Sequence, residues 1–268
     1  MHLVACLQMR SGPEITENLA QVEVGMERAA RYGVKLLTTP ENTTFLGPSD
    51  QKVALSEALD GSTHRRLADL ARLHRMYLLV GSVAERFDAT HCYNTSLFFS
   101  PEGDLLAYYR KIHLFDIDIP GGPRFQESAT IRPGNEVVVV PTALGRIGLS
   151  ICYDLRFPLL YQKLVEKGAE ILMVPSAFTL QTGKDHWHPL LRARAIESQC
   201  YLLAPAQEGP HDSGGLRHSY GHSLILDPWG TVLAECGEGP GLCLAEIDLE
   251  RVRKVRRAIP VRQHQVRL

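Results

Sequence analysis

The sequence predicts a mixed α/β protein whose sheet contains both parallel and antiparallel strands. Strand-like apolar segments alternate with amphipathic helical segments along the 268 residues, a pattern typical of βαβ units. Hairpin signals interrupt this alternation in both halves, and a hairpin pairs its strands antiparallel. Hydrophobic residues make up 44% of the chain and charged residues 22%. Such a composition can bury a sizeable core, which excludes disordered, collagen-like and coiled-coil proteins.

The first half begins with a βαβ pattern and ends in a hairpin. Leu19, Val22 and Met26 recur at helical spacing and indicate the first helix. Ser62 or Thr63 is the candidate N-cap of the second helix. The expected elements, in order, are a strand at 3–9, a helix at 14–32, a strand at 34–39, a helix through 67–74, and strands at 77–84, 93–99 and 105–109.

The second half repeats this organisation. Pro158 is suited to the first turn of a helix, and the turn 227–230 contains the Pro and Gly of a tight hairpin connection. The expected elements are strands at 137–140 and 147–152, helix 158–167, strand 171–174, a helix near 187–199, strand 201–206 and a hairpin of 223–226 with 231–234. No low-complexity linker divides the chain, so we expect one domain over residues 1–268.

Charge and targeting signals exclude several classes of protein. The 29 Lys and Arg residues nearly balance 30 Asp and Glu, which argues against a nucleic-acid partner. No basic leader precedes the strand at 3–9, and no apolar run approaches the roughly 20 residues of a membrane span. We therefore expect a cytoplasmic protein without a membrane partner.

The cysteines and histidines give little sign of a metal centre. The six cysteines contain no C-x-x-C pair, and in a chain of this kind we expect reduced thiols. His186 and His188 form an isolated H-x-H, which is weak evidence for metal binding. The sequence therefore predicts no bound metal.

Three chemically active side chains occur where predicted strands end. Cys152 follows an apolar strand and precedes a helix, where a helix N-terminus would lower the pKa of the thiol; a buried strand cysteine is the alternative. Glu41 ends the strand at 34–39, and Lys111 follows the strand at 105–109. Each charge alone is typical of a solvated surface. Together the three residues supply a base, a cation and a nucleophile.

The segments around these residues resemble the carbon-nitrogen hydrolase (nitrilase) superfamily over essentially the whole chain. The matching segments are Pro40-Glu41-Asn42, residues 109–116, Phe125-Gln126-Glu127-Ser128 and residues 151–158. The resemblance implies a single-domain α-β-β-α sandwich with mixed sheets. It also implies a homodimer or higher homo-oligomer that associates through its helical layers.

The resemblance also implies the role of each site residue. Cys152 would attack an amide carbonyl and form a thioester, with Glu41 as general base. Lys111 and the backbone N–H of Tyr153 would stabilise the oxyanion, and Glu127 would orient Lys111 or the substrate and help to transfer protons. Neither a metal nor an organic cofactor is needed.

These residues are also compatible with two other kinds of protein. A papain-like Cys/His enzyme would need a histidine partner, and among the 11 histidines only His113 lies in a matching segment. We expect His113 to be structural. A non-catalytic binding protein that kept the fold is a further alternative, against which the presence of all four catalytic residue types argues.

The resemblance extends to two kinds of amidase within the family. Residues 186–201, 220–223, 227–230 and 238–243 resemble amidases of deaminated glutathione, whereas residues 113–120 and 125–128 resemble ω-amidases of 2-oxoglutaramate. We expect a small-molecule amide substrate with a 2-oxoglutaramate-like end, preferably deaminated glutathione, and release of ammonia. The alternatives are an ω-amidase that acts on 2-oxoglutaramate and another amidase or N-carbamoyl hydrolase of the superfamily.

Such a substrate carries a carboxylate, so its pocket needs a cation. Arg156 is the candidate, with an ion pair to Asp154 as the alternative. Phe178 and Thr182 follow another strand end and are expected to line the pocket together with Tyr153.

Two other charged segments have simpler explanations. Arg194 and Glu197 lie three residues apart on a predicted helix and are expected to form an ion pair. The basic run 251–257 is expected to be a solvated helix face.

Overall fold

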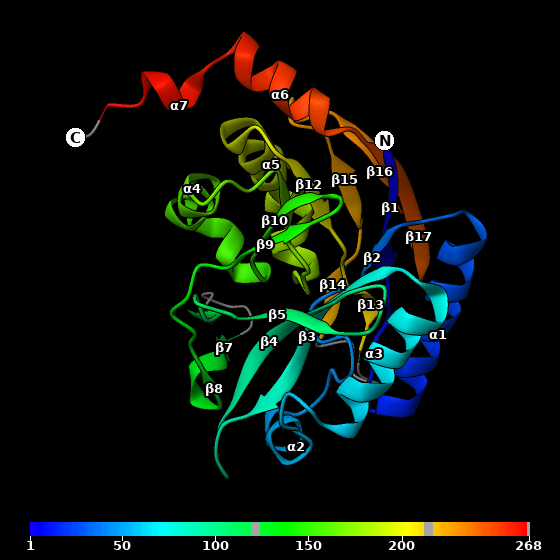
Figure 1. The fold of residues 1–268 in the computed structure, drawn as a ribbon. Helices are drawn as coiled ribbons and strands as arrows, with labels where there is room; N and C mark the ends of the chain where they lie inside the picture. The colour runs from blue at the N-terminus through cyan, green and yellow to red at the C-terminus, as the bar shows by residue number, and fades with distance from the viewer. Residues whose placement is uncertain (119–123, 212–216, 267–268) are drawn as a thin grey trace.

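Two β-sheets lie face to face and carry helices on their outer faces (Figure 1). The structure is a computed structural model that describes residues 1–118, 124–211 and 217–266. Figure 1 shows α1 and α3 together over one sheet and α4 and α5 together over the other. The protein is therefore the α-β-β-α sandwich that the family resemblance implied.

The first sheet joins the start of the chain to a late strand. Its order is β17 (Gly241–Ile247), β1 (His2–Gln8), β2 (Leu36–Thr38), β3 (Tyr77–Arg86), β4 (Cys92–Phe99) and β5 (Leu105–Arg110), with β8 (Ile131–Arg132) paired to β4. Strands β1, β2 and β3 are parallel to one another. Strand β17 pairs antiparallel with β1, and β5 pairs antiparallel with β4.

The second sheet has the same mixed character. Its order is β16 (Val232–Glu235), β15 (Leu224–Leu226), β12 (Tyr201–Ala204), β11 (Ile171–Met173), β10 (Gly145–Leu149) and β9 (Val139–Thr142). Its three central strands, β10, β11 and β12, are parallel. Two small ribbons pair β6 (Asp116–Asp118) with β7 (Arg124–Gln126) and β13 (Glu208–Pro210) with β14 (His218–Tyr220).

The helices complete the outer layers and the ends of the sandwich. They are α1 (Ile15–Arg31), α2 (Ser49–Ala54), α3 (Ser62–His74), α4 (Pro158–Glu166), α5 (Leu180–Ser198), α6 (Leu249–Ala258) and α7 (Val261–His264), with short 3₁₀ turns η1 (Glu127–Ala129) and η2 (Cys152–Arg156). Within the described residues, no helix combines the length and the apolar character needed to cross a membrane.

Side chains alternate between the two faces of each strand, so the strands of the first sheet contribute to two separate hydrophobic clusters. Val4 and Cys6 of β1 face the second sheet, whereas Ala5 and Leu7 belong to the cluster packed against α1 and α3. Met26 of α1 is fully buried in that cluster. Burial of such a side chain contributes about 1.5–3 kcal/mol. Apolar packing on both faces of the first sheet therefore holds the layers together.

Two helix starts differ from the sequence prediction. Gly61 occupies the N-cap position of α3 without a side-chain bond, while Thr63 donates its hydroxyl to Glu57. Helix α5 begins at Leu180, capped by Thr179, well before the expected start near residue 187. The expected hairpins β4–β5 and β15–β16 are confirmed. All six cysteines are free thiols, as expected.

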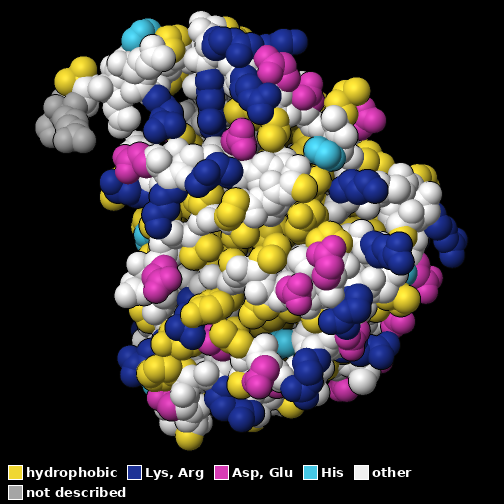
Figure 2. Space-filling view, in the orientation of Figure 1, with side chains coloured by type: hydrophobic (Ala, Val, Ile, Leu, Met, Phe, Trp, Pro, Cys, Tyr) yellow, Lys and Arg dark blue, Asp and Glu magenta, His cyan; other side chains and the backbone are white. Residues whose placement is uncertain are grey.

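The basic run 251–257 belongs to α6, which crosses one end of the sandwich. Figure 2 shows Lys and Arg side chains gathered over this helix at the top of the molecule. Val252 and Val255 of this helix are buried on its inner face, and Arg251 forms an ion pair with Asp227 at 2.9 Å. One face of the helix is therefore packed and only the other is solvated.

Candidate active site

Cys152 lies on a tight turn at the end of β10. Its φ is +47°, a left-handed conformation that is strained for a residue with a Cβ. The backbone N–H of Cys152 donates to the Pro175 carbonyl at 2.9 Å, which ties this turn to the end of β11. The turn directs the thiol into a pocket instead of into the sheet.

A buried carboxylate fixes this turn. Asp154 is fully buried and accepts hydrogen bonds from the Ile151 N–H at 2.9 Å and the Tyr109 hydroxyl at 2.7 Å. It also accepts from the His113 N–H at 3.0 Å and contacts His113 Nδ1 at 2.7 Å. His113 therefore helps to hold the Asp154 carboxylate in place, which is the structural role expected from the sequence.

The anticipated alternative of an Arg156–Asp154 ion pair is wrong. Among the described residues, Asp154 contacts the turn, β5 and His113, while Arg156 Nη1 lies 3.3 Å from His186 Nδ1. The Arg156 guanidinium also lies 5.3 Å from the centre of the Phe178 ring. Arg156 therefore points along the pocket wall.

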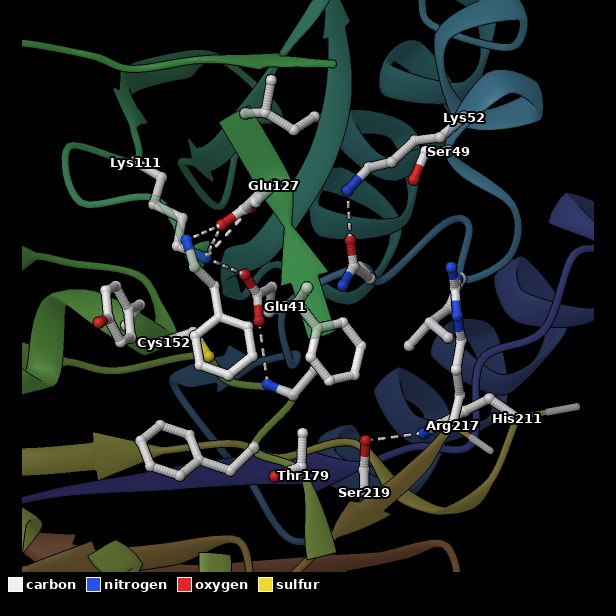
Figure 3. A pocket seen from close by; sticks show the side chains of 18 of the residues that line it. Glu41, Ser49, Lys52, Lys111, Glu127, Cys152, Thr179, His211, Arg217 and Ser219 are labelled. Atoms are coloured by element: carbon white, nitrogen blue, oxygen red, sulfur yellow. Dashed lines mark hydrogen bonds and ion pairs between the residues drawn. The ribbon is translucent and has the colours of Figure 1, made fainter. Parts of the chain in front are cut away.

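Lys111 links two carboxylates beside the thiol. Its Nζ donates to Glu41 Oε1 at 2.9 Å and to Glu127 Oε2 at 2.8 Å (Figure 3). Asn94 Nδ2 also donates to both, at 2.9 Å to Glu41 and 3.1 Å to Glu127. Glu41 Oε2 accepts the Ala177 N–H at 3.1 Å, so this carboxylate bridges elements of both sheets.

The pKa of the Cys152 thiol is shifted in the direction opposite to the one expected from the sequence. Burial and the Glu41 carboxylate raise the pKa of Cys152 well above its ordinary value, although Lys111 acts in the opposite direction. The predicted lowering of this pKa by a helix N-terminus is therefore wrong. Desolvation of the thiol outweighs the weak dipole of a five-residue 3₁₀ turn.

The cation and the second carboxylate both keep their charges. Burial opposes the charge of Lys111, but Glu127 and Glu41 outweigh it and raise the pKa of Lys111 well above its ordinary value. Burial likewise acts to raise the pKa of Glu127, but Lys111 outweighs it and lowers that pKa. At neutral pH the site therefore contains an ammonium ion and ionised Glu127 beside a protonated thiol.

A pocket of about 210 Å³ surrounds these groups. All eight site residues expected from the sequence line it: Glu41, Lys111, Glu127, Cys152, Tyr153, Arg156, Phe178 and Thr182. Figure 3 shows Lys52 and Arg217 on the other side of the pocket from Lys111 and Cys152. Cations thus lie on both sides of the space available to a ligand.

The sequence did not indicate Asn94, which bonds to the two carboxylates, or two cations that line the pocket. Asn94 was hidden inside a predicted strand, although a polar amide in an apolar hairpin was a usable signal. Lys52 and Arg217 come from segments without a recognised motif, and their place depends on the tertiary fold. Ile119 and Pro120, part of an expected substrate-related segment, lie outside the described residues.

Comparison with family models shows the family to which the chain belongs. A model described as carbon-nitrogen hydrolase matches residues 3–257. The chain belongs to the carbon-nitrogen hydrolase family. A deaminated glutathione amidase from Synechocystis sp. is 45% identical to this hydrolase, over 99% of the chain and 98% of the relative.

Solved structures agree with this family and with its fold. The NitFhit protein of C. elegans is 42% identical with a TM-score of 0.93, and the match covers 98% of this hydrolase and 65% of that chain. A variant of the amidase from Nesterenkonia sp. AN1 is 27% identical with a TM-score of 0.81, and the match covers 99% and 100% of the two chains. That amidase carries the product of Michael addition of acrylamide at its active-site cysteine.

Proposed function

We propose that this hydrolase cleaves the amide of deaminated glutathione that follows its 2-oxoglutaramate-like end, with Cys152 as nucleophile. The observation that carries this proposal is the Glu41–Lys111–Glu127 cluster, hydrogen-bonded beside the Cys152 thiol in the pocket. The name of the relative at 45% identity supports the substrate. Acrylamide addition to a cysteine of the Nesterenkonia amidase supports the nucleophile.

The first step moves a proton within the site. Glu41 takes the proton of the Cys152 thiol, and the thiolate sulfur bonds to the amide carbonyl carbon while the carbonyl oxygen becomes an oxyanion. The proton transfer leaves the net charge of the buried site unchanged, so burial opposes it less than it opposes loss of the proton to water. Lys111 and the Tyr153 N–H stabilise the oxyanion.

The second step releases the amine and then the acid. The tetrahedral intermediate collapses, the C–N bond breaks, and Glu41 returns its proton to the leaving nitrogen. Glu41 next takes a proton from water, whose oxygen attacks the thioester carbon. The C–S bond then breaks, and Glu41 gives this proton to the Cys152 sulfur, which releases the acid and restores the thiol. In deaminated glutathione the leaving nitrogen belongs to cysteinylglycine. The ammonia expected from the sequence is therefore the product only of a primary amide such as 2-oxoglutaramate.

The cations of the pocket favour the longer substrate. Deaminated glutathione has one carboxylate on the 2-oxo acid and a second on its glycine. We assign the first to Arg156, which lies between the Tyr153 and Phe178 rings at 5.9 and 5.3 Å. Lys52 and Arg217, on the opposite side, are assigned to the second. A 2-oxoglutaramate molecule has no second carboxylate for them.

The test measures 2-oxoglutarate, the acid product common to both substrates. We expect a higher kcat/KM for deaminated glutathione than for 2-oxoglutaramate, and no product from either with Cys152→Ala. The Lys52→Met/Arg217→Met double variant should lose about 10–100-fold in kcat/KM on deaminated glutathione alone, in line with about 1–3 kcal/mol for the two charge-assisted contacts. Arg66→Met, an exposed cation on α3, is the control.

Each result separates one part of the proposal from another. A preference for 2-oxoglutaramate would make the protein an ω-amidase and overturn the substrate assignment. Ordinary turnover by folded Cys152→Ala would overturn the covalent mechanism. Folded wild-type protein that leaves both substrates intact would return the chain to the binding-protein alternative.

We also infer that residues 1–268 act as one domain and that two or more copies associate through the α4–α5 layer. Leu159 and Ile196 on these helices are 64% and 50% exposed, which is unusual for large apolar side chains. Light scattering of the purified protein measures this. Replacement of both residues by Glu should give a monomer, and a wild-type monomer would contradict the inference.

A further inference from the structure

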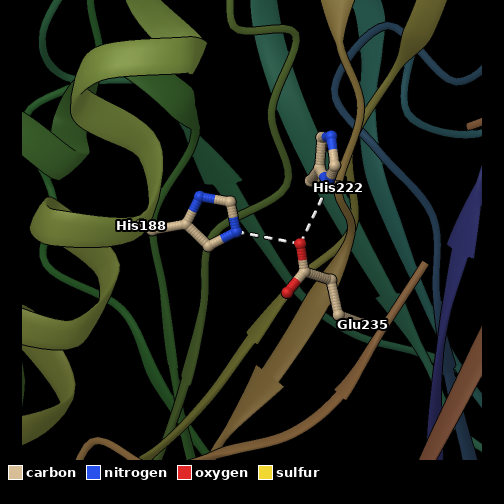
Figure 4. A group of neighbouring side chains, drawn as sticks. All are labelled: His188, His222 and Glu235. Carbon is tan, nitrogen blue, oxygen red and sulfur yellow. Dashed lines mark hydrogen bonds and ion pairs between the residues drawn. The ribbon is translucent and has the colours of Figure 1, made fainter. Parts of the chain in front are cut away.

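Two histidines and a glutamate meet outside the pocket. His188 comes from α5, His222 from the segment between β14 and β15, and Glu235 from the end of β16 (Figure 4). His188 Nε2 lies 2.9 Å from Glu235 Oε1, and His222 Nδ1 lies 2.8 Å from the same oxygen. The three possible ligand atoms all lie within 4.8 Å of one another.

The backbone around this cluster is held in place. Trp187, which precedes His188, is fully buried and donates its indole N–H to the His222 carbonyl at 2.8 Å. The φ of His222 is +57°, so the chain turns sharply where this imidazole projects. The Tyr220 ring packs against both imidazoles, with ring centres 6.1 and 4.5 Å away. The convergence of the three side chains is therefore built into the fold.

We propose that His188, His222 and Glu235 bind one Zn²⁺ ion. Two neutral imidazoles and one carboxylate carry a charge of −1 and supply the nitrogen and oxygen ligands that zinc takes. Donors around a tetrahedral zinc, at bond lengths near 2.0 Å, lie about 3.3 Å apart. The two nitrogen–oxygen separations, 2.9 and 2.8 Å, are a few tenths of an ångström shorter than this spacing, and all three donors lie within 4.8 Å of one another. The three side chains are 31–32% exposed, which leaves them room to adjust around an ion. Magnesium and calcium prefer sites made of oxygen alone.

The H-x-H of the sequence is not the site. His186 contacts Arg156 at the pocket, whereas His188 contacts Glu235, so the two histidines have different neighbours. The other two ligands, His222 and Glu235, lie 34 and 47 residues after His188 in the sequence. Only the fold brings the three together, which explains why spacing alone predicted no metal.

A zinc ion bound here would stabilise one wall of the pocket. None of its three residues lines the pocket, which makes a direct role of the ion in the reaction unnecessary. However, Thr182 at the start of α5 and Ser219 on β14 do line it. An ion that ties α5 and the β14–β15 segment to β16 therefore stabilises the elements that carry these side chains.

The test measures zinc binding directly. Chelator-treated protein in the Cys152→Ala background, which removes the catalytic thiol as a competing ligand, is titrated with ZnCl₂ by calorimetry. We expect one equivalent to bind with a Kd in the micromolar range or below and to raise Tm. Co²⁺ in the same protein should give the visible absorption bands of a tetrahedral site.

Matched variants locate the ion. His188→Ala and Glu235→Gln should each weaken binding at least 100-fold, whereas His186→Ala, two residues away on the same helix, should keep wild-type affinity. Circular dichroism and the Tm of the metal-free proteins confirm that the variants fold. Failure of the parent protein to bind zinc, or equal affinity in all variants, would overturn the proposal.

Discussion

At the scale of single residues, the distribution of charge in the buried site explains why the nucleophile needs a base. Glu41 and Glu127 share the Lys111 ammonium, so two negative charges face one positive charge. Forming a free thiolate there would add a further negative charge in a desolvated place. In the proposed mechanism the Cys152 proton therefore passes to Glu41 during the reaction instead of leaving beforehand.

Replacement of Glu41 by Gln should separate thiol acidity from catalysis. Burial would still raise the pKa of Cys152, but the variant removes the charge that raises it further and keeps Lys111, which lowers it, so this pKa should fall. At the same time kcat should fall about 100-fold or more for lack of a general base. The pH dependence of iodoacetamide alkylation measures the first effect and steady-state turnover the second. An unchanged or higher thiol pKa in the folded variant would contradict this account.

Replacement of Lys111 by Met should remove the charge that stabilises the oxyanion. Loss of one such donor typically costs about 10²–10³ in kcat, or about 3–4 kcal/mol. The variant also leaves Glu41 and Glu127 without their shared cation, so its Tm and circular dichroism must be measured beside kcat. Folded protein with wild-type kcat would exclude Lys111 from the reaction.

The residues of this site could be predicted only partly from the sequence. Glu41, Lys111 and Cys152 follow the ends of strands. A polar residue that follows an apolar run can be recognised from the sequence alone. Asn94 bonds to both carboxylates from inside a strand, and nothing local marks which partners it meets. The acidity of Cys152 depends on burial and on Glu41, 111 positions earlier, which spacing does not reveal.

At the scale of elements, η2 is held by a hydrogen bond that reaches it from β5. The Tyr109 hydroxyl donates to Asp154, and Asp154 accepts the N–H of Ile151 directly before the nucleophile. Burial and the nearby Asp154 charge raise the pKa of Tyr109 well above its ordinary value, so this hydroxyl keeps its proton at neutral pH. A strained turn is thus supported from the opposite sheet.

Tyr109→Phe should weaken this support without removing a catalytic group. A hydrogen bond to a charged acceptor contributes about 1.5–3 kcal/mol, so the free energy of unfolding should fall by about that amount and kcat should fall with it. Tyr161→Phe is the matched control, because its buried hydroxyl contacts neutral Ser150 at 2.8 Å. Equal losses of kcat in the two variants would assign Tyr109 only a packing role.

The start of helix α5 could not be predicted correctly from the sequence. Pro189 lies inside the helix, and apolar residues do not follow one face through its first turns, so periodicity indicated only the later part. The true start is marked by Thr179, whose side chain accepts the Thr182 N–H at 3.3 Å. A capping threonine was present in the sequence, but the proline and histidines that follow obscured it.

At the scale of the whole molecule, the active site connects the two sheets. Glu41 and Lys111 follow strands of the first sheet, whereas Cys152 and Ala177 follow strands of the second. The sequence predicted mixed pairing but not this stacking, since strands buried on both faces give no sign of which layer they join. The sandwich was expected only through the family resemblance.

Charge in this cross-sheet site should make stability depend on pH. The pKa of Glu127 is lower in the folded protein than its ordinary value of 4.5, because Lys111 outweighs the effect of burial. Its contribution is therefore complete above the unfolded pKa and is lost as pH falls through the folded pKa. Urea unfolding of wild type between pH 6 and 3 should lose more free energy than unfolding of Glu127→Gln. Identical slopes would contradict this assignment.

The pairing of β1 with β17 has a consequence for synthesis of the protein. β1 is synthesised long before its neighbour on one side, which is made of residues 241–247. During most of translation the strand Leu3-Val4-Ala5-Cys6-Leu7 has an unpaired apolar edge, which is a template for association with other nascent chains. The first sheet can therefore close only after residues 241–247 have been synthesised, and chaperones that shield β1 until then should raise the yield of native protein.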